Sequence, residues 1–319
     1  MRPFYISLRP FLDHRRLCRP TQWQSLFDNT HPIHVEIGFG NGEYLAKLKQ
    51  ENAGINFIGF EEYCERIAKT LRKLSRVPGE NVRVMRMDVR PGFKYLFTPQ
   101  SIDFIYCLFP PPWPKKSDIK HRYLNADFLR VINNRLRAGG AMTIVTDYRP
   151  YADWIEEQLP GTGFNWQRKT IPASYGTKFE QKWVGEGKRE FDEICLAKKE
   201  HIDIAQTQET ALNHYKVAGF DPEAFQMGEY TDGNIAVVFK EYLYDPKRQK
   251  AIVHTLVHDE HLLQNVRIMI AAEGDLWWVT LAPGTLLMPT PGVAKALECV
   301  RDAAEKTTKE SLPVKRIPT

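Results

Sequence analysis

The sequence IHVEIGFGNGE at residues 33–43 decides the fold, because it joins an apolar run to three closely spaced glycines. Ile33 to Ile37 is rich in branched apolar side chains and predicts a buried strand. Gly38 to Gly42 predicts a turn, since glycine adopts backbone conformations that other residues avoid. Tyr44 to Lys49 can then form a helix. The stretch therefore predicts a strand, a glycine loop and a helix in succession.

The same alternation continues along the chain. Strands are predicted at 56–61, 82–87, 102–108 and 141–146, and helices at 64–74 and 125–136. Asn125 is a suitable N-cap for the second helix, and Ala138-Gly139-Gly140 is expected to form the turn after it. Strands that alternate with helices indicate a Rossmann-like α/β domain, a doubly wound parallel sheet with its ligand at the carboxyl ends of the strands. We expect this domain at 33–204.

The pattern changes after a polar stretch near residues 198–210. Strands joined by short turns are predicted at 235–244, 251–257, 266–272 and 276–281, with a closing helix at 291–305. We therefore expect a small C-terminal α+β domain with an antiparallel sheet at 205–319, for which the sequence indicates no role. Residues 1–32 are basic and lack a long apolar period, so they are expected to form an N-terminal arm.

Composition excludes several classes of protein. With 319 residues, 43% hydrophobic and 26% charged, the chain is expected to be globular and long enough for two domains. Its five cysteines are scattered and odd in number, which argues against a disulfide framework and against a metal site. No apolar stretch approaches the length of a membrane span. A cytoplasmic protein without a membrane anchor is expected, and its oligomeric state is left open.

An acid on the second predicted strand indicates a nucleotide-like cofactor. Glu61 ends that strand nineteen residues after Gly42, where a carboxylate can accept both hydroxyls of a ribose. Gly38 and Gly40 would let the backbone approach the ligand closely. The dinucleotide fingerprint would need another glycine, but glutamate follows Gly42. The alternative interpretation is a plain turn between a strand and a helix.

The acids beside the loop favour S-adenosyl-L-methionine over NAD or ATP. Glu36 and Glu43 would repel a pyrophosphate, whereas the sulfonium and ammonium groups of S-adenosyl-L-methionine are cationic. Asp88 ends the third predicted strand and could bind the adenine amino group or, equally, cap the next helix. The expected cofactor contacts are Glu36, Gly38, Gly40, Gly42, Glu61 and Asp88.

A proline-rich segment at residues 109–116, FPPPWPKK, follows the strand at 102–108. Prolines lack the backbone donor of a strand interior, so the segment must end that strand abruptly. Trp113 could fill the core beneath the turn or stack on a base. The cations that follow could be solvated or could bind phosphates, and we expect phosphate contacts from Lys115, Lys116, Lys120 and Arg122.

Four motifs together resemble the bacterial tRNA (guanine-N7-)-methyltransferases. The resemblance runs from about Val35 to Trp183. Its motifs are Glu36 to Glu43, Phe109 to Lys116, Thr146-Asp147-Tyr148 and Thr177-Lys178-Phe179-Glu180-Gln181. It implies cofactor contacts from Glu36, Glu61 and Asp88, and tRNA or guanine contacts from Lys115, Asp147, Thr177 and Glu180.

The proline-rich segment departs from the family pattern at one position. The family usually has Phe-Pro-Asp-Pro-Trp, and here Pro111 replaces the aspartate. Ser117-Asp118-Ile119 also replaces part of the basic run that follows. Asp147 and Glu180 are expected to reach the same rim and to supply the missing carboxylate, so both are predicted catalytic residues. Reduced activity is expected relative to a protein with the acid.

The chemistry of guanine N7 does not require that acid. N7 carries an in-plane lone pair and needs no deprotonation, so alignment with the methyl carbon is the main requirement. Methylation of guanine N7 in tRNA is therefore the leading hypothesis. The alternatives are methylation of an exocyclic amine and a catalytically silent protein that binds tRNA or the cofactor.

Overall fold

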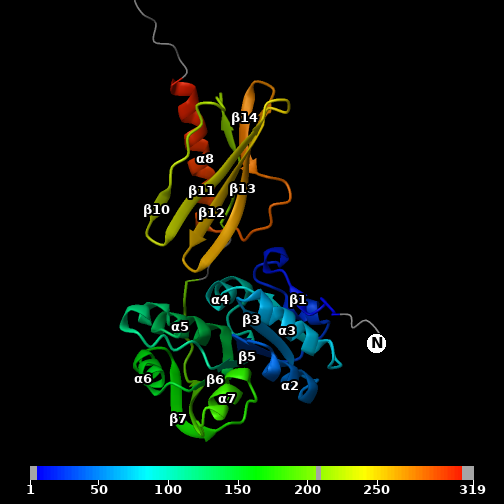
Figure 1. Ribbon diagram of the computed structural model, residues 1–319, viewed down its shortest axis with the longest axis vertical. Helices are drawn as coiled ribbons and strands as arrows, with labels where there is room; N and C mark the ends of the chain where they lie inside the picture. Colours follow the sequence, from blue (N-terminus) through cyan, green and yellow to red (C-terminus); the bar gives the residue numbers. More distant parts are fainter. Residues whose placement is uncertain (1–5, 206–209, 311–319) are drawn as a thin grey trace, which may run out of the picture. The chain divides into compact units, whose positions relative to one another are not determined.

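A computed structural model describes residues 6–205 and 210–310 of the chain. The chain divides into two compact units, unit 1 at Met1–Thr207 and unit 2 at Gln208–Thr319, and each is described by itself (Figure 1). Of the segments expected as an N-terminal arm and a C-terminal domain, residues 1–5, 206–209 and 311–319 lie outside the described residues.

Unit 1 is built on a mixed sheet of eight described strands. Their order is β1-β4-β3-β2-β5-β6-β8-β7. The strands are β1 Phe11–Leu12, β2 Ile33–Ile37, β3 Asn56–Glu61, β4 Val82–Arg86, β5 Ile102–Leu108, β6 Leu136–Thr146, β7 Phe164–Pro172 and β8 Glu190–Lys198. The six strands from β1 to β6 pair in parallel, and β8 is antiparallel to both β6 and β7. The doubly wound Rossmann-like fold is confirmed.

Strand order reverses at β2, which lies between β3 and β5. Ile37, the last residue of β2, is in register with Phe60 on one side and Cys107 on the other. In such sheets a crevice opens beyond the carboxyl ends of the strands at the point of reversal. The glycine loop starts directly after Ile37 and is therefore placed at this crevice.

Helices cover both faces of this sheet (Figure 1). Phe57 of β3 packs with α2 and α3 through residues such as Leu45 and Leu71. Phe60 has the opposite parity in the strand and packs with Phe93 of α4, with ring centroids 6.0 Å apart. The helices of unit 1 are α1 Trp23–Phe27, α2 Glu43–Glu51, α3 Cys64–Leu74, α4 Val89–Leu96, α5 Ala126–Arg135, α6 Arg149–Gln158 and α7 Lys178–Gly185, with 3₁₀ turns η1 His14–Arg16 and η2 Lys116–His121.

The N-terminal segment is packed into unit 1. Strand β1 pairs in parallel with β4, through Phe11 with Val84. Trp23 is only 4% exposed and stacks on Phe97 with ring centroids 5.1 Å apart. The basic segment expected as an arm therefore contributes an edge strand and buried aromatic side chains.

The predicted strands at 33–37 and 56–61 and the helix at 64–74 are confirmed, and Asn125 caps α5 by accepting from the Phe128 amide. The prediction of a separate turn at 138–140 is wrong, because these residues lie within β6. Strand β6 already begins at Leu136, which pairs with Ile102, and the register then shifts before Phe104. Gly139, with φ of 75°, accommodates this irregular start.

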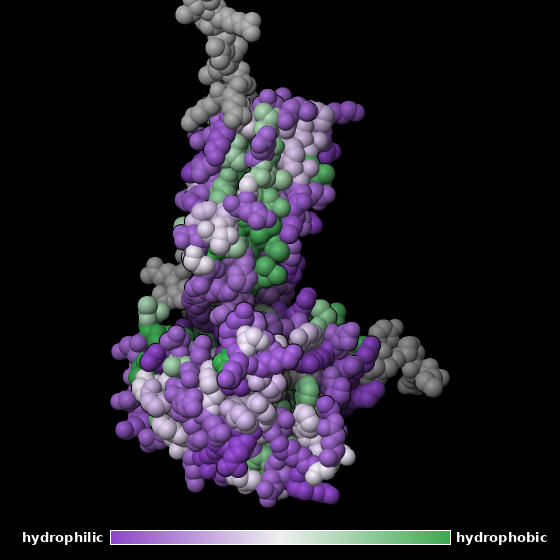
Figure 2. All heavy atoms as spheres, turned by 60° about the vertical axis from the view of Figure 1, so that its left-hand side comes forward, coloured by the Kyte–Doolittle hydropathy of each residue, from purple (hydrophilic) through white to green (hydrophobic). Residues whose placement is uncertain are grey.

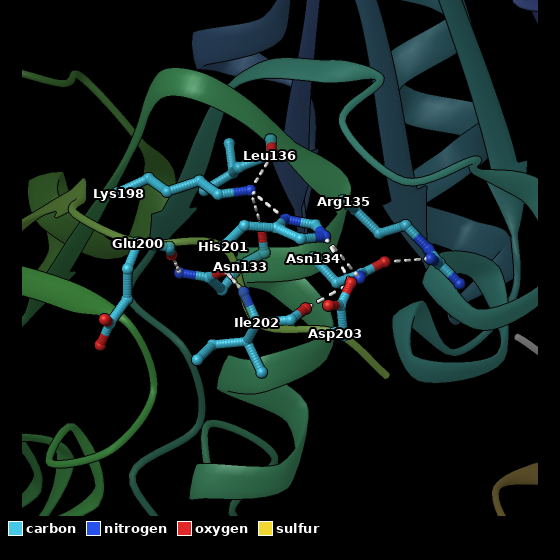
Figure 3. A network of polar contacts seen from close by, with 9 residues as sticks. All are labelled: Asn133, Asn134, Arg135, Leu136, Lys198, Glu200, His201, Ile202 and Asp203. Carbon is cyan, nitrogen blue, oxygen red and sulfur yellow. Dashed lines mark hydrogen bonds and ion pairs between the residues drawn. The ribbon is translucent and has the colours of Figure 1, made fainter. Parts of the chain in front are cut away.

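A polar network fastens the last described part of unit 1 (Figure 3). The Asn133 side chain is fully buried, donates to the carbonyl of Glu200 at 3.0 Å and accepts from the Ile202 amide at 2.9 Å. Asn134 donates to the Ile202 carbonyl at 2.9 Å. Lys198 donates to the carbonyls of Asn133 and Leu136. Residues 200–203 are thus held against the end of α5 and the start of β6.

Unit 2 is an antiparallel sheet with one helix on it. The strand order is β10-β11-β12-β13-β14-β9. Val253 and Val257 of β12 pack with Leu297 and Val300 of α8, and all four side chains are fully buried. Figure 2 shows hydrophobic residues also reaching the surface of this unit. The elements are β9 Tyr215–Val217, β10 Tyr230–Asp232, β11 Ile235–Asp245, β12 Lys250–Asp259, β13 Leu262–Glu273, β14 Leu276–Leu281 and α8 Pro291–Glu310.

The predicted α+β pattern of the C-terminal part is confirmed, with the four long strands β11 to β14 and the closing helix near their expected places. None of the helices in the described part of the chain is long and apolar enough to cross a membrane.

Candidate active site

A cavity of about 380 Å³ lies at the carboxyl ends of the parallel strands. It is lined by the residues that end β2, β3 and β5, and by residues that directly follow β4 and β6. Four carboxylates line it, those of Glu61, Glu62, Asp88 and Asp147. The ends of five strands thus surround one ligand-sized space, at the place that the fold predicts.

A smaller cavity of about 40 Å³ lies beside the glycine loop. Glu36, Gly40 and Glu43 line it together with Thr177 and Lys178. The two cavities share four lining residues, which are Gly38, Arg66, Leu108 and Phe179. An elongated ligand can therefore extend from the large cavity into the small one.

The glycine loop has the backbone conformation that its residues predict. Gly38, Gly40 and Gly42 have φ of 70°, 57° and 74°, in the left-handed region that side chains with a Cβ disfavour. A Cβ on Gly42 would also lie 2.4 Å from the Thr70 side chain. Near Gly38 and Gly40 the space is open, since a Cβ there would meet no atom within 4 Å. The loop thus combines a close packing contact with room for a ligand.

Glu36 is a buried acid without a cation beside it. Its side chain is 2% exposed, and its Oε2 has no hydrogen-bond partner among the described residues. Burial, helped by the nearby Glu43 carboxylate, raises the pKa of Glu36 to about 8. Glu43 itself pairs with Lys73 at 2.6 Å. An ammonium group in the small cavity would supply the charge that Glu36 lacks, and S-adenosyl-L-methionine carries one.

We expect the affinity for S-adenosylhomocysteine, which keeps this ammonium group, to rise with pH up to about 8. Below that pH the free protein holds Glu36 protonated, so binding of the cation must release a proton, at a cost of up to about tenfold in affinity per pH unit. Burial raises the pKa values of Tyr44 and Tyr106 further above 10, so these neighbours stay neutral. Titration calorimetry in buffers of different ionisation enthalpy would measure the number of protons released on binding.

Glu36→Gln is the matched control, since it keeps the shape and removes the titration. Its affinity should be lower than that of the wild type at pH 8 and nearly independent of pH. A wild-type affinity that does not change between pH 6 and pH 8 would contradict this role of Glu36.

Glu61 is held in place by backbone amides. Its Oε1 accepts from the amides of Glu62 at 2.9 Å and Tyr63 at 3.1 Å, and its Oε2 accepts from Gly40 at 3.1 Å. Arg66 Nη1 lies 3.3 Å from the same Oε2. The carboxylate therefore joins the glycine loop to the end of β3 and faces the large cavity, as a ribose acceptor must.

Asp88 combines both roles that its position allows. It is the N-cap of α4, where its Oδ1 accepts from the Arg90 amide at 2.7 Å, and its carboxylate forms an ion pair with the Arg90 guanidinium. It also lines the large cavity. Arg90 donates to both oxygens of this carboxylate, and the predicted adenine contact stays a prediction.

The proline-rich segment has the strained conformation of a sharp stop. Phe109 and Trp113 have φ of 55° and 44°, which is uncommon for residues with side chains. The Phe109 amide donates to the Val145 carbonyl at 2.7 Å, and its ring packs edge-on against Phe191 at 5.3 Å. These contacts hold the turn, so that Pro110, Pro111 and Pro112 line the large cavity.

Arg122 braces this turn from behind, contrary to the expected phosphate contact. Its side chain donates to the carbonyls of Pro112 at 2.8 Å and Trp113 at 3.3 Å. The guanidinium lies over the rings of Tyr151 and Trp154, and the residue is only 6% exposed. A cation committed to two carbonyls and two aromatic faces is not available to a phosphate.

The other cations of the segment are exposed. Lys115, Lys116 and Lys120 all lie on the surface. Trp113 is 38% exposed, with its ring 5.1 Å from that of His121. The three lysines and Trp113 are therefore accessible to a nucleic acid, and contacts from Lys115, Lys116 and Lys120 stay predictions.

Asp147 is the acid placed beside Pro111. Strands β5 and β6 are neighbours, with Leu108 in register with Val145, and each of the two residues lies shortly beyond its strand end. Both line the large cavity. Burial raises the pKa of Asp147, while Lys188 and Lys182 oppose the shift. A carboxylate is thus present on the rim next to the position where the usual acid is replaced.

A sequence profile described as a putative methyltransferase matches residues 30–193. The tRNA (guanine-N(7)-)-methyltransferase of Chlorobium phaeobacteroides is 38% identical over 171 residues, covering 54% of this chain and 84% of that protein. The chain belongs to the tRNA (guanine-N7-)-methyltransferase family.

Relatives in this methyltransferase family differ in how much of the chain they match. A tRNA (guanine-N(7)-)-methyltransferase of Aquifex aeolicus is 26% identical over 297 residues, 91% of this chain and 97% of that protein, so its match includes most of unit 2. Among solved structures, an antibiotic-related methyltransferase has a TM-score of 0.43 and 17% identity over 55% of this chain and 92% of that chain.

Two residues of the fourth family motif have structural roles. Thr177 is the N-cap of α7 and accepts from the Glu180 amide at 3.1 Å. The Glu180 carboxylate, 2% exposed, accepts from the amides of Ser174, Tyr175 and Gly176. Glu180 does not line the large cavity. Its geometry supports the shape of the loop, and a direct guanine contact from it has no support here.

Sequence reasoning missed three residues of the methyltransferase site, Arg66, Tyr123 and Phe179, which all line the large cavity. Phe179 lies within the fourth motif and could have been found there. Arg66 lies in the first turn of α3, only five residues after Glu61, and that spacing was the available signal. Tyr123 is half-buried, and its hydroxyl lies 3.4 Å from the Cys107 thiol, a contact that no local pattern indicates.

Proposed function

We propose that this protein uses S-adenosyl-L-methionine to methylate N7 of guanine in tRNA. One observation carries the proposal: the cavity lined by the cofactor acids Glu61 and Asp88 is also lined by Pro111 and Asp147 of the family's substrate motifs. A methyl donor and a guanine could therefore meet in one space.

The cofactor site fits its ligand by charge and shape. Glu36 offers the ammonium group a buried oxygen, Oε2, that has no hydrogen-bond partner among the described residues, and Glu61 would face the ribose. Apolar side chains such as Met87 and Val89 provide a surface for the adenine ring beside Asp88. When bound, S-adenosyl-L-methionine supplies an electrophilic methyl group on a sulfonium.

The protein's residues then align the acceptor and stabilise the product. Guanine N7 attacks in line, so the barrier falls mainly through orientation and exclusion of water, without a general base. N7-methylguanine is cationic, and its N1 proton is more acidic than that of guanine. A carboxylate facing N1-H and N2-H would bind this state better than the reactant, and we assign this role to Asp147, which lines the cavity.

The tRNA backbone would be held by the exposed lysines beside the cavity. Lys115, Lys116 and Lys120 lie in and after the proline-rich segment, and affinity from such contacts should fall as salt increases. We also propose a cytoplasmic location, where tRNA and reduced thiols are found, and the five cysteines are free.

The decisive experiment uses the full chain, methyl-labelled cofactor and unmodified tRNA, followed by nucleoside analysis. We expect 7-methylguanosine as the labelled product. Labelled N2-methylguanosine or N6-methyladenosine would instead indicate transfer to an exocyclic amine. Cofactor and tRNA binding without any labelled nucleoside would indicate a catalytically silent protein.

Replacing Pro111 with aspartate should raise the turnover. Pro111 is exposed at the cavity, so Pro111→Asp places a second carboxylate opposite the developing cation with little change in packing. We expect the rate constant of methyl transfer to increase by about threefold to tenfold, measured under single-turnover conditions. Pro114→Asp, outside the cavity lining, is the control. An unchanged or lower rate for Pro111→Asp would contradict the role given to the acid.

A further inference from the structure

Arg66 lies at the junction of the two cavities. It belongs to the first turn of α3 and lines both the large cavity and the small one. Its Nη1 is 3.3 Å from Glu61 Oε2, and its guanidinium lies 4.6 Å from the Tyr63 ring centroid and 5.7 Å from that of Phe179. One side chain thus connects the end of β3 with the first turn of α7.

The Glu61 carboxylate has few acceptor sites left for a ligand. A carboxylate offers about four lone-pair sites. Three accept backbone amides, those of Gly40, Glu62 and Tyr63. Arg66 takes the fourth. A ribose hydroxyl that donates to this acid needs the acceptor site that Arg66 now holds. The amides are fixed by the fold, whereas the arginine side chain can rotate.

The position of Arg66 along the ligand gives an independent reason. The acids that line the cavities assign the adenosine part of the cofactor to the large cavity, beside Glu61 and Asp88, and the amino acid part to the small one, beside Glu36. The bonds that join these two parts must cross the boundary that Arg66 shares with Gly38, Leu108 and Phe179. A guanidinium at this boundary also repels the sulfonium.

We propose that Arg66 competes with the cofactor for Glu61 and must move away before the ribose can bind. In the structure Glu61 is paired with Arg66, and the cofactor would replace this internal cation. Arg66 thereby limits both the affinity and the rate of cofactor binding. The inference rests on the proposed function only in that the ligand is a nucleoside with a free ribose.

The test compares Arg66→Ala with the wild type in binding S-adenosylhomocysteine. Loss of an arginine that contacts the ligand would weaken binding. Loss of a competitor should strengthen it, by roughly three- to fivefold for a partly exposed ion pair. Arg66→Lys, which keeps a cation near Glu61, should lie between the two. Arg72→Ala, on an exposed position of the same helix, is the matched control and should bind as the wild type does.

Association kinetics add a measurement that a purely structural role would not change. In stopped-flow mixing, the association rate constant of the wild type should be lower than that of Arg66→Ala, because side-chain rotation is fast and only the fraction of molecules with Arg66 turned away can bind. The observed rate should rise linearly with ligand concentration for both proteins, with a steeper slope for Arg66→Ala. Weaker binding by a folded Arg66→Ala, or equal association rate constants for the two proteins, would overturn the proposal. No binding of S-adenosylhomocysteine by the wild type would instead refute the proposed function.

Discussion

Asp147→Asn is expected to lower kcat/KM for tRNA methylation by about two to three orders of magnitude. Asp147 is the acid beside Pro111 at the end of the neighbouring strand, and the charge on its carboxylate would stabilise the cationic product base. Asparagine keeps the size of the side chain and the backbone carbonyl that accepts from Lys188. Steady-state kinetics with full-length tRNA would measure the loss.

The pH profile distinguishes a charge effect from a packing effect. Burial raises the pKa of Asp147 above that of an ordinary aspartate, and the ionised form is the one required. Activity should therefore fall with decreasing pH at a higher pH than 3.8, the usual aspartate value. Asp147→Asn should lose this limb of the profile. Asp127→Asn, at an exposed site on α5, is the control and should keep both rate and profile.

An Asp147→Asn protein with more than a third of the wild-type kcat/KM would remove Asp147 from the mechanism. The chain would then have no carboxylate beside Pro111 that acts on guanine, and orientation alone would account for its rate.

Glu180→Gln is expected to reduce the free energy of unfolding of unit 1 by about 2 to 3 kcal/mol. The buried carboxylate of Glu180 accepts from three amides of the loop that precedes α7. Glutamine replaces one acceptor oxygen with an NH₂ group. This hydrogen-bond donor would then face backbone amides that are donors themselves. Denaturant unfolding followed by circular dichroism would measure the change, with Glu186→Gln as control on the exposed end of the same helix.

Glu180→Gln should also lower activity. The cause is the loosened loop and not the loss of a group that takes part in methyl transfer. Phe179 and Trp183 of α7 line the large cavity, so a loosened loop removes part of its wall. The loss of activity should shrink on cooling, as the loop reforms. A Glu180→Gln protein that unfolds like the wild type yet transfers no methyl group would restore Glu180 as a catalytic candidate.

The part of the fold that local pattern determines could be predicted from the sequence. Strands β2 and β3 and helix α3 have the predicted bounds, since buried strands of branched residues and an amphipathic helix carry their own signal. Strands β7 and β8 could not be predicted in the same way. They pair at the antiparallel edge, and β7 is largely exposed, so its sequence lacks the apolar run of a central strand.

The positions of candidate site residues were predictable where they follow from a strand end, as for Glu61 and Asp147, which both line the large cavity. The role of a residue was not predictable where its side chain forms hydrogen bonds with backbone groups that are distant in the sequence. Arg122 follows three lysines in the sequence and resembles a phosphate contact, yet its guanidinium donates to the carbonyls of the proline turn. Glu180 is an acid within a family motif, yet its carboxylate accepts hydrogen bonds from three loop amides. These hydrogen bonds depend on tertiary packing, which cannot be derived from composition and motif spacing.

The network at residues 133–136 and 198–203 determines where unit 1 could be excised as an independent protein. A fragment that stops at Lys198 would leave the buried amide of Asn133 without the backbone groups of Glu200 and Ile202 (Figure 3). A fragment that retains Asp203 would keep every one of these bonds. Residues 199–203 therefore belong to unit 1, and the boundary of a truncated or fused protein should lie after Asp203.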